Sequence, residues 1–109
     1  ILGRAVIYEA PVSGVSRSAH RNAANRHLAR QLSLDAELES QLNKQLGTDV
    51  LQHMQSGRGL LNPPGTVWHH PINNGSIVQL MRREVHSNPD FQLYLHPRNI
   101  GGYGTYYGQ

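Results

Sequence analysis

Two adjacent histidines, His69 and His70, end the short β-branched run Thr66–Trp68 and stand directly before Pro71. Neighbouring side chains in a regular strand point to opposite faces, so both imidazoles can serve one site only where the strand ends and the chain twists. Pro71 favours such an ending. A pair of this kind can divide two catalytic tasks, because one imidazole can hold a metal ion while the other accepts a proton.

Two further histidines, His86 and His96, follow in the next segments of the chain. Together with His69 they could form a three-nitrogen metal site that leaves positions open for water and substrate. The sequence contains no cysteine, so a transition-metal site must use His, Asp, Glu, Asn or water. If a phosphodiester binds there, His70 would remove a proton from the attacking water while the cation stabilises the leaving oxygen.

Charged residues near these histidines suggest supporting roles. Arg82, Arg83 or Arg98 could clamp phosphate oxygens, and Glu84 could orient an arginine or a ligand histidine. Three imidazoles favour Zn²⁺ or Ni²⁺, whereas phosphodiester hydrolysis often uses Mg²⁺ or Mn²⁺, and we expect one bound Zn²⁺. The candidate catalytic residues are therefore His70, Glu84 and Arg83, and the candidate metal ligands are His69, His86 and His96.

The pattern around the histidines predicts a β-hairpin followed by a helix. Proline and glycine residues mark the entrance, and a run of Asn and Gly that tolerates positive φ marks the reversal. Trp68 is expected to anchor the hairpin in the core. The predicted elements are a stiff turn at Asn62–Gly65, a strand at Thr66–His70, a turn at Asn73–Gly75, a return strand at Gly75–Arg82, a helix at Arg82–Ser87 and a second short helix at Pro89–Leu95.

The first half predicts a short strand or extended arm at Arg4–Tyr8 and then three helices. A first helix from Arg17 to Leu32 follows Ser16 as its N-cap. A second is capped by Ser33, buries a face of leucines and ends at Gly47, and a third runs from the cap Thr48 to Met54. The leucines of that face are Leu34, Leu38, Leu42 and Leu46.

The remaining histidines and arginines fall in the polar surroundings of these helices. His20, His27 and His53 are therefore expected to be exposed. At 100° per residue, Arg17 and Arg21 lie near Leu28, whereas Arg26 and Arg30 lie roughly opposite. Because these arginines form no single stripe, we interpret them as a solvated surface rather than a nucleic-acid footprint.

The chain has 109 residues and a mass of 12.2 kDa, which bounds it to one small α+β domain, residues 1–109. Residues 16–56 would form a helical support, and residues 62–109 would carry the site. The formal charge is +3, and nine of the ten cationic residues are arginine, which is compatible with nucleic acid. No apolar run is long enough to span a bilayer. Because the chain begins at Ile1 without methionine, we expect it to be a fragment of a longer one.

These residues resemble a known family of nucleases. Trp68-His69-His70-Pro71, the returning strand, Arg83-Glu84-Val85-His86, and His96 followed by Gly101-Gly102 resemble the Trp-His-His class of HNH/endonuclease VII nucleases. The resemblance covers about Asn62 to Gly102, and it implies a ββα-metal (His-Me finger) core packed on the helical half. It also implies that His69, His86 and His96 bind the metal and that His70 is the general base.

The same resemblance sets expectations about function. Such domains stand at the C-termini of bacterial polymorphic toxins, so we expect a metal-dependent DNA endonuclease that leaves 5′-phosphate ends. We expect an effector that is secreted or delivered and acts in the cytoplasm of a target bacterium, with a cognate acidic immunity protein as its partner. Two alternatives stay open: an RNase that uses the same site, and a non-enzymatic, zinc-supported nucleic-acid-binding domain.

Overall fold

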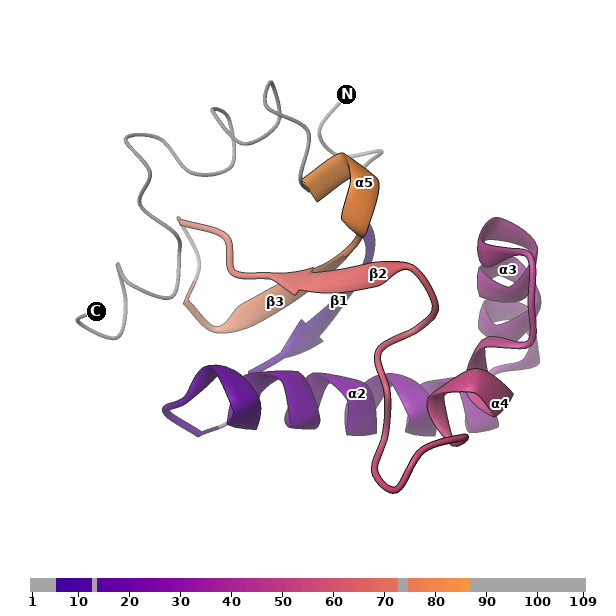
Figure 1. Ribbon diagram of the computed structural model, residues 1–109, viewed down its shortest axis with the longest axis horizontal. Helices are drawn as coiled ribbons and strands as arrows, with labels where there is room; N and C mark the ends of the chain where they lie inside the picture. Colours follow the sequence, from indigo (N-terminus) through magenta and orange to yellow (C-terminus); the bar gives the residue numbers. More distant parts are fainter. Residues whose placement is uncertain (1–5, 13, 73–74, 87–109) are drawn as a thin grey trace.

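The computed structural model describes residues 6–12, 14–72 and 75–86, and these form an α+β fold, as expected. Three antiparallel strands and four helices make up the described part (Figure 1). The succession of β2, β3 and α5 is consistent with the expected ββα arrangement. The elements are β1 (Val6–Pro11), α2 (Arg17–Leu34), α3 (Ala36–Leu46), α4 (Val50–Met54), β2 (Thr66–His69), β3 (Ile77–Arg82) and α5 (Arg83–His86).

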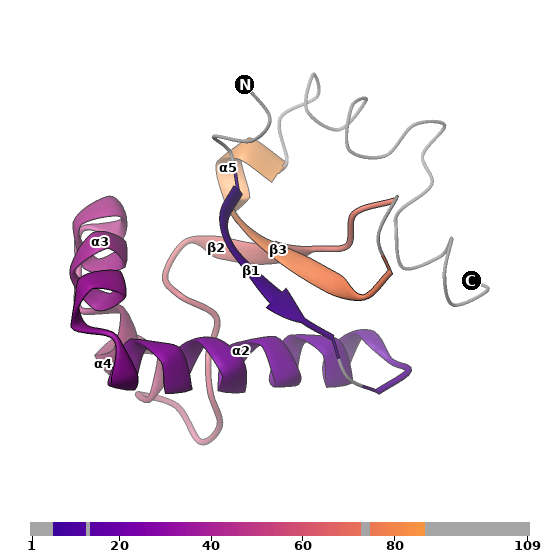
Figure 2. The ribbon, with the colours of Figure 1, turned by 180° about the vertical axis from the view of Figure 1, so that it is seen from behind.

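The sheet has the strand order β1-β3-β2, with β3 in the centre. The expected hairpin is confirmed, because β2 pairs with β3 in a register that sets Thr66 opposite Arg82 and His69 opposite Gln79. The N-terminal strand β1 joins the other edge of β3, and its pairing runs from Val6 opposite Met81 to Pro11 opposite Ile77 (Figure 2). The sheet therefore ties the start of the chain to the hairpin.

Helix α2 lies along one face of the sheet and supplies much of the core (Figure 1). Side chains alternate across a strand, so Val78 and Leu80 of β3 both face this helix. Trp68 packs against the same core from β2, as the sequence predicts. The buried residues of the larger core cluster are Leu28, Ala29, Leu32, Leu42, Val50, Met54 and Leu80.

The junction between the first two helices differs from the prediction. Ser16 caps α2 as expected, since its hydroxyl accepts a hydrogen bond from Ala19 N. The predicted cap Ser33 is wrong, because α2 continues to Leu34 and Asp35 is the N-cap of α3. Leu34 therefore ends α2 with 71% of its surface exposed instead of opening the buried face of α3. Leucines further along α3 do pack into or against the core.

Of the two later helix boundaries, the predicted end of α3 is confirmed and the predicted cap of α4 is not. Gly47 ends α3 with a φ of 74°, a left-handed conformation that glycine adopts without strain. The cap of α4 is Asp49, whose carboxylate accepts from Gln52 N, so the prediction of Thr48 is wrong.

Several predictions lie outside the described residues. These are the Asn73-Asn74 turn, the short helix at Pro89–Leu95, His96, the candidate phosphate ligand Arg98 and the glycine-tyrosine tail. Among the described helices, none combines the length and the apolar character needed to cross a bilayer.

Candidate functional site

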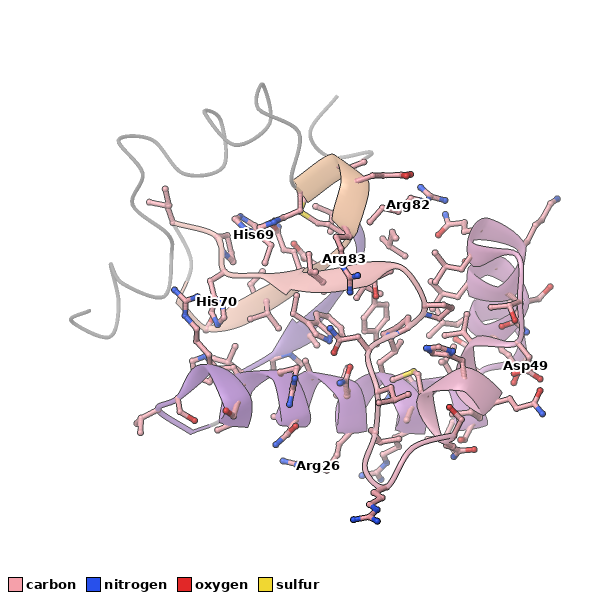
Figure 3. The ribbon with its side chains drawn as sticks, in the orientation of Figure 1. Arg26, Asp49, His69, His70, Arg82 and Arg83 are labelled. Carbon is pink, nitrogen blue, oxygen red and sulfur yellow. The ribbon has the colours of Figure 1, made fainter. Side chains whose placement is uncertain are left out.

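The two adjacent histidines lie where β2 ends. His69 is the last residue of the strand and is 3% exposed, and His70 is the first residue beyond it. Trp68 faces α2, so alternation turns His69 to the opposite face, toward α5, and returns His70 to the side of α2. Figure 3 shows the two labelled imidazoles on different levels at this end of the strand. The strand ends as predicted, but each histidine has a different partner.

His69 lies against His86 of α5. Their ring centroids are 5.2 Å apart, and the ring planes are inclined by 59°. The hydrogen bond from Arg83 N to Gly65 O, 2.8 Å long, fixes the start of α5 beside β2. Two imidazoles that share a tetrahedral Zn²⁺ at about 2.0–2.1 Å from each nitrogen have centroids roughly 5 Å apart. The His69–His86 pair therefore fits two ligands of one cation.

A third ligand is not found in the described part of the chain. Within residues 6–12, 14–72 and 75–86, no group of three His, Cys, Asp or Glu side chains is close enough to hold a metal ion. The third expected ligand, His96, lies outside these residues. The structure thus brings together two of the three predicted ligands.

The partner of His70 is His20, whose polar surroundings in the sequence predict an exposed side chain. That prediction is wrong, because His20 is fully buried at the start of α2. Its Nδ1 lies 3.0 Å from His70 Nε2, and its Nε2 lies 2.9 Å from the carbonyl oxygen of Gly14. Steps of four residues lead from Leu28 through Ala24 to His20, and this spacing is the sequence signal for its burial.

These two contacts assign the tautomer of both rings. A carbonyl oxygen only accepts, so the nitrogen of His20 that faces Gly14, Nε2, carries a proton. In neutral His20 the other nitrogen, Nδ1, is then an acceptor, and His70 must donate to it from Nε2. Neutral His70 consequently carries its lone pair on Nδ1. This is the nitrogen that can take up a proton.

The surroundings keep His70 uncharged. Burial, the neighbouring His20 and the positive charge of Arg17 lower the pKa of His70 to about 4. Burial has the largest effect, because it removes the water that stabilises the imidazolium. His70 is therefore a neutral imidazole with a defined tautomer at neutral pH.

A polar network holds β2 against α2 beside these histidines. Asn25 is fully buried, and its Oδ1 accepts a hydrogen bond of 2.8 Å from Trp68 Nε1. Its Nδ2 donates to Asn62 Oδ1 over 2.9 Å. One amide thus joins the helix, the strand and the loop that enters it. Removing it would leave the buried indole N–H without its acceptor.

The charged candidates differ in their environments. Arg82 points toward α3, where its guanidinium donates to the carbonyl oxygen of Gln45 over 2.9 Å (Figure 3). Arg83 and Glu84 are exposed on α5, and Arg83 borders an open cleft beside β2. Glu84 lies on the same short helix as His86. Its role as an orienting residue stays a prediction.

The other two helix histidines also depart from the expected full exposure. His27 is half-buried, with its Nε2 3.1 Å from the hydroxyl of Tyr8 in β1. His53 is half-buried in α4 and lines the same cleft as Arg83.

Comparison with models of protein families, with curated proteins and with solved structures finds no match for this chain. The arrangement of His20, His69, His70 and His86 is therefore the basis for assigning a function.

Proposed function

We propose that the chain is a metal-dependent endonuclease that hydrolyses DNA phosphodiester bonds. One observation carries the proposal: two histidine pairs flank the end of β2, His69 with His86 on one side and His70 with His20 on the other. The first pair suits a shared cation, and the second holds a neutral imidazole in one tautomer. A phosphodiester lying across the end of β2 would contact both.

In this proposal His70 is the general base. Its Nδ1 takes the proton of the attacking water, and its Nε2–H remains bonded to His20 throughout. A base with a pKa near 4 is weak in the empty site, but the charge of a bound phosphodiester raises the pKa of a neighbouring imidazole.

His69 and His86 would hold the cation, and His96 remains the predicted third ligand. When bound, a divalent ion neutralises charge on the phosphate and stabilises the leaving oxygen. Arg83 would supply a positive charge to phosphate oxygens of the substrate backbone, since a guanidinium fork matches phosphate geometry. We retain Zn²⁺ as the expected ion because both described ligands are imidazoles.

The biological setting remains part of the proposal and rests on the resemblance to the Trp-His-His nucleases. It comprises a toxin domain that acts inside a target bacterium, products with 5′-phosphate ends and an acidic immunity protein. An acidic partner suits a surface with a formal charge of +3.

The first test is plasmid cleavage by the purified protein, with and without a chelator, beside the variant His70→Ala. We expect cleavage that the chelator abolishes and that His70→Ala lowers by about 10²- to 10⁴-fold, the usual contribution of a positioned base. His27→Ala is the matched control, because it removes a histidine of α2 that lies away from the end of β2. It should cleave at the wild-type rate.

Metal content and substrate distinguish the alternatives. If His70→Ala retains its metal and fold but loses cleavage, the base assignment holds. Loss of metal from this variant would instead favour the zinc-supported binding domain. Cleavage of RNA but not DNA would mean that the protein is an RNase with the same mechanism. If both DNA and RNA stay intact after exposure to metallated wild-type protein, the proposal of an enzyme is refuted.

A further inference from the structure

An open cleft runs beside β2 and shares Arg83 with the site described above. Its volume is about 460 Å³, and its walls come from α2, α4, the loop before β2 and the first residue of α5. Two arginines and a histidine line it, and no carboxylate does among the described residues. Its polar lining residues are Arg21, His53, Asn62, Thr66 and Arg83.

We propose that this cleft binds a phosphate of the nucleic-acid backbone next to the one that is cleaved. The inference rests on the proposed function and adds a second anchoring point for the same strand. Arg21 of the helical half and Arg83 of α5 would hold that phosphate together.

The charges of the two arginines are not compensated within the described structure. Both residues are exposed, and neither guanidinium forms a described hydrogen bond or ion pair. In contrast, the guanidinium of Arg82 donates to a backbone carbonyl. Each guanidinium can make a bidentate contact with a phosphate, and two that line one concave surface are suited to hold the same anion.

The direction of Arg21 follows from its place on α2. It lies 20° from Leu28 around the helix at 100° per residue, so it projects on the sheet side of α2, where it lines the cleft. Figure 3 shows Arg83 in front of β2, whereas Arg26 projects from α2 on the side away from the sheet. Arg21 and Arg26 therefore have different surroundings, although both are exposed.

Arg17 links the cleft to the base. It is close enough to His70 to contribute to its lowered pKa, and it precedes Arg21 by one helical turn on the same face. Side chains four residues apart on a helix have Cβ atoms about 5–6 Å apart. A strand whose scissile phosphate lies at His70 would therefore bring a neighbouring phosphate to Arg21.

The cleft is held open by contacts within the protein. Asn62 is bonded to the buried Asn25, Leu61 N donates to Met54 O, and Gly65 O accepts from Arg83 N. Pro63 is buried and restricts the backbone of the same loop. A preformed site does not lose binding energy to ordering its own walls.

The experiment measures DNA affinity by fluorescence anisotropy, with a labelled duplex oligonucleotide and a chelator present so that no cleavage occurs. Arg21→Gln should weaken binding several-fold and lower the slope of log affinity against log salt by roughly 0.9, the value for one lost phosphate contact. Arg26→Gln, with the same loss of charge on the same helix, should keep the wild-type slope. Equal slopes and affinities for the two variants would overturn the proposal.

A double-mutant cycle tests whether the two arginines share one phosphate. Arg21→Gln with Arg83→Gln should weaken binding less than the product of the two single effects, because the second substitution removes an already weakened contact. Multiplicative effects would contradict a shared site. If DNA binding depends on Arg21 but the protein does not cleave DNA, only the nuclease proposal is refuted. If the protein cleaves DNA but Arg21→Gln does not change its DNA affinity, only the cleft proposal is refuted.

Discussion

At the scale of single residues, the contact between His20 and His70 has the clearest chemical consequence. The carbonyl of Gly14 fixes the proton on one nitrogen of His20, and that assignment leaves the lone pair of His70 on Nδ1. His20 thus takes the place that a carboxylate holds beside a catalytic histidine, but it adds no negative charge. It orients His70 and determines which nitrogen is basic, so we regard it as a positioning residue.

This role predicts different outcomes for two substitutions of His20. His20→Leu removes both hydrogen bonds and should lower the cleavage rate about 10- to 100-fold, the range for a residue that orients a catalytic group. His20→Gln can donate to Gly14 O and accept from His70, so it should restore most of the rate. Imidazole ¹⁵N shifts of His70 give the tautomer directly. Full activity in a folded His20→Leu variant, or a proton on Nδ1 of neutral wild-type His70, would contradict this role.

The sequence predicts only part of this site, for reasons of distance along the chain. His69 and His86 are joined by a hairpin and a short helix, so the register of neighbouring strands brings them together. His20 and His70 are separated by 50 positions, and only the packing of α2 on the sheet unites them. Local polarity indicated an exposed His20, whereas tertiary packing buries it.

At the scale of elements, Asp35 explains why the boundary between α2 and α3 was misplaced. Ser33 and Asp35 are both good N-cap residues, and the leucine repeat starting at Leu34 favoured the earlier one. In the structure Asp35 has extended backbone angles and its carboxylate accepts from Glu37 N and Leu38 N. Ser33 instead lies inside α2 and donates to Ala29 O. The pattern predicted both helices but could not choose between two adequate caps.

This assignment predicts unequal stability losses at the two positions. Asp35→Ala removes the acceptor for two backbone N–H groups and should lower the free energy of unfolding by about 1 kcal/mol. Ser33→Ala should change it by less than about 0.5 kcal/mol. Asp35→Asn keeps an acceptor without the charge and should resemble the wild type. Urea unfolding of the variants provides the measurement. A larger loss of unfolding free energy for Ser33→Ala than for Asp35→Ala would mean that Ser33 is the N-cap.

At the scale of the whole molecule, direct contacts join the helical half to the hairpin. Strand β1 pairs with β3, α2 fills the face of the sheet, and Asn25 bonds to both Trp68 and Asn62. The sequence predicted the helical half and the hairpin separately. It could not predict their joint sheet, because an edge strand far away in the chain has no local signal for its partner. The paired histidines accordingly come from both residues 16–56 and residues 62–109.

The buried, neutral state of His70 should make the stability of the whole protein depend on pH. Its pKa is about 4 in the folded protein and about 6.5 in the unfolded chain, so between these values the unfolded state binds more protons. Stability should be unaffected by this group above pH 6.5 and should fall as the pH decreases from 6.5 to 4. Because the imidazole is only half-buried, we expect a loss on the order of 1 kcal/mol after allowance for solvent screening.

The measurement is urea unfolding of metal-depleted protein at several pH values, beside His70→Gln. The variant lacks the titrating imidazole, so its free energy of unfolding should fall less over this range. Carboxylates that titrate in the same pH range are present in both proteins, so the difference between the two curves gives the contribution of His70. Parallel curves for both proteins would mean that His70 has the same proton affinity in the folded and unfolded states. In that case burial beside His20 would not lower the pKa of the imidazole, and His70 would titrate in the folded protein as it does in the unfolded chain.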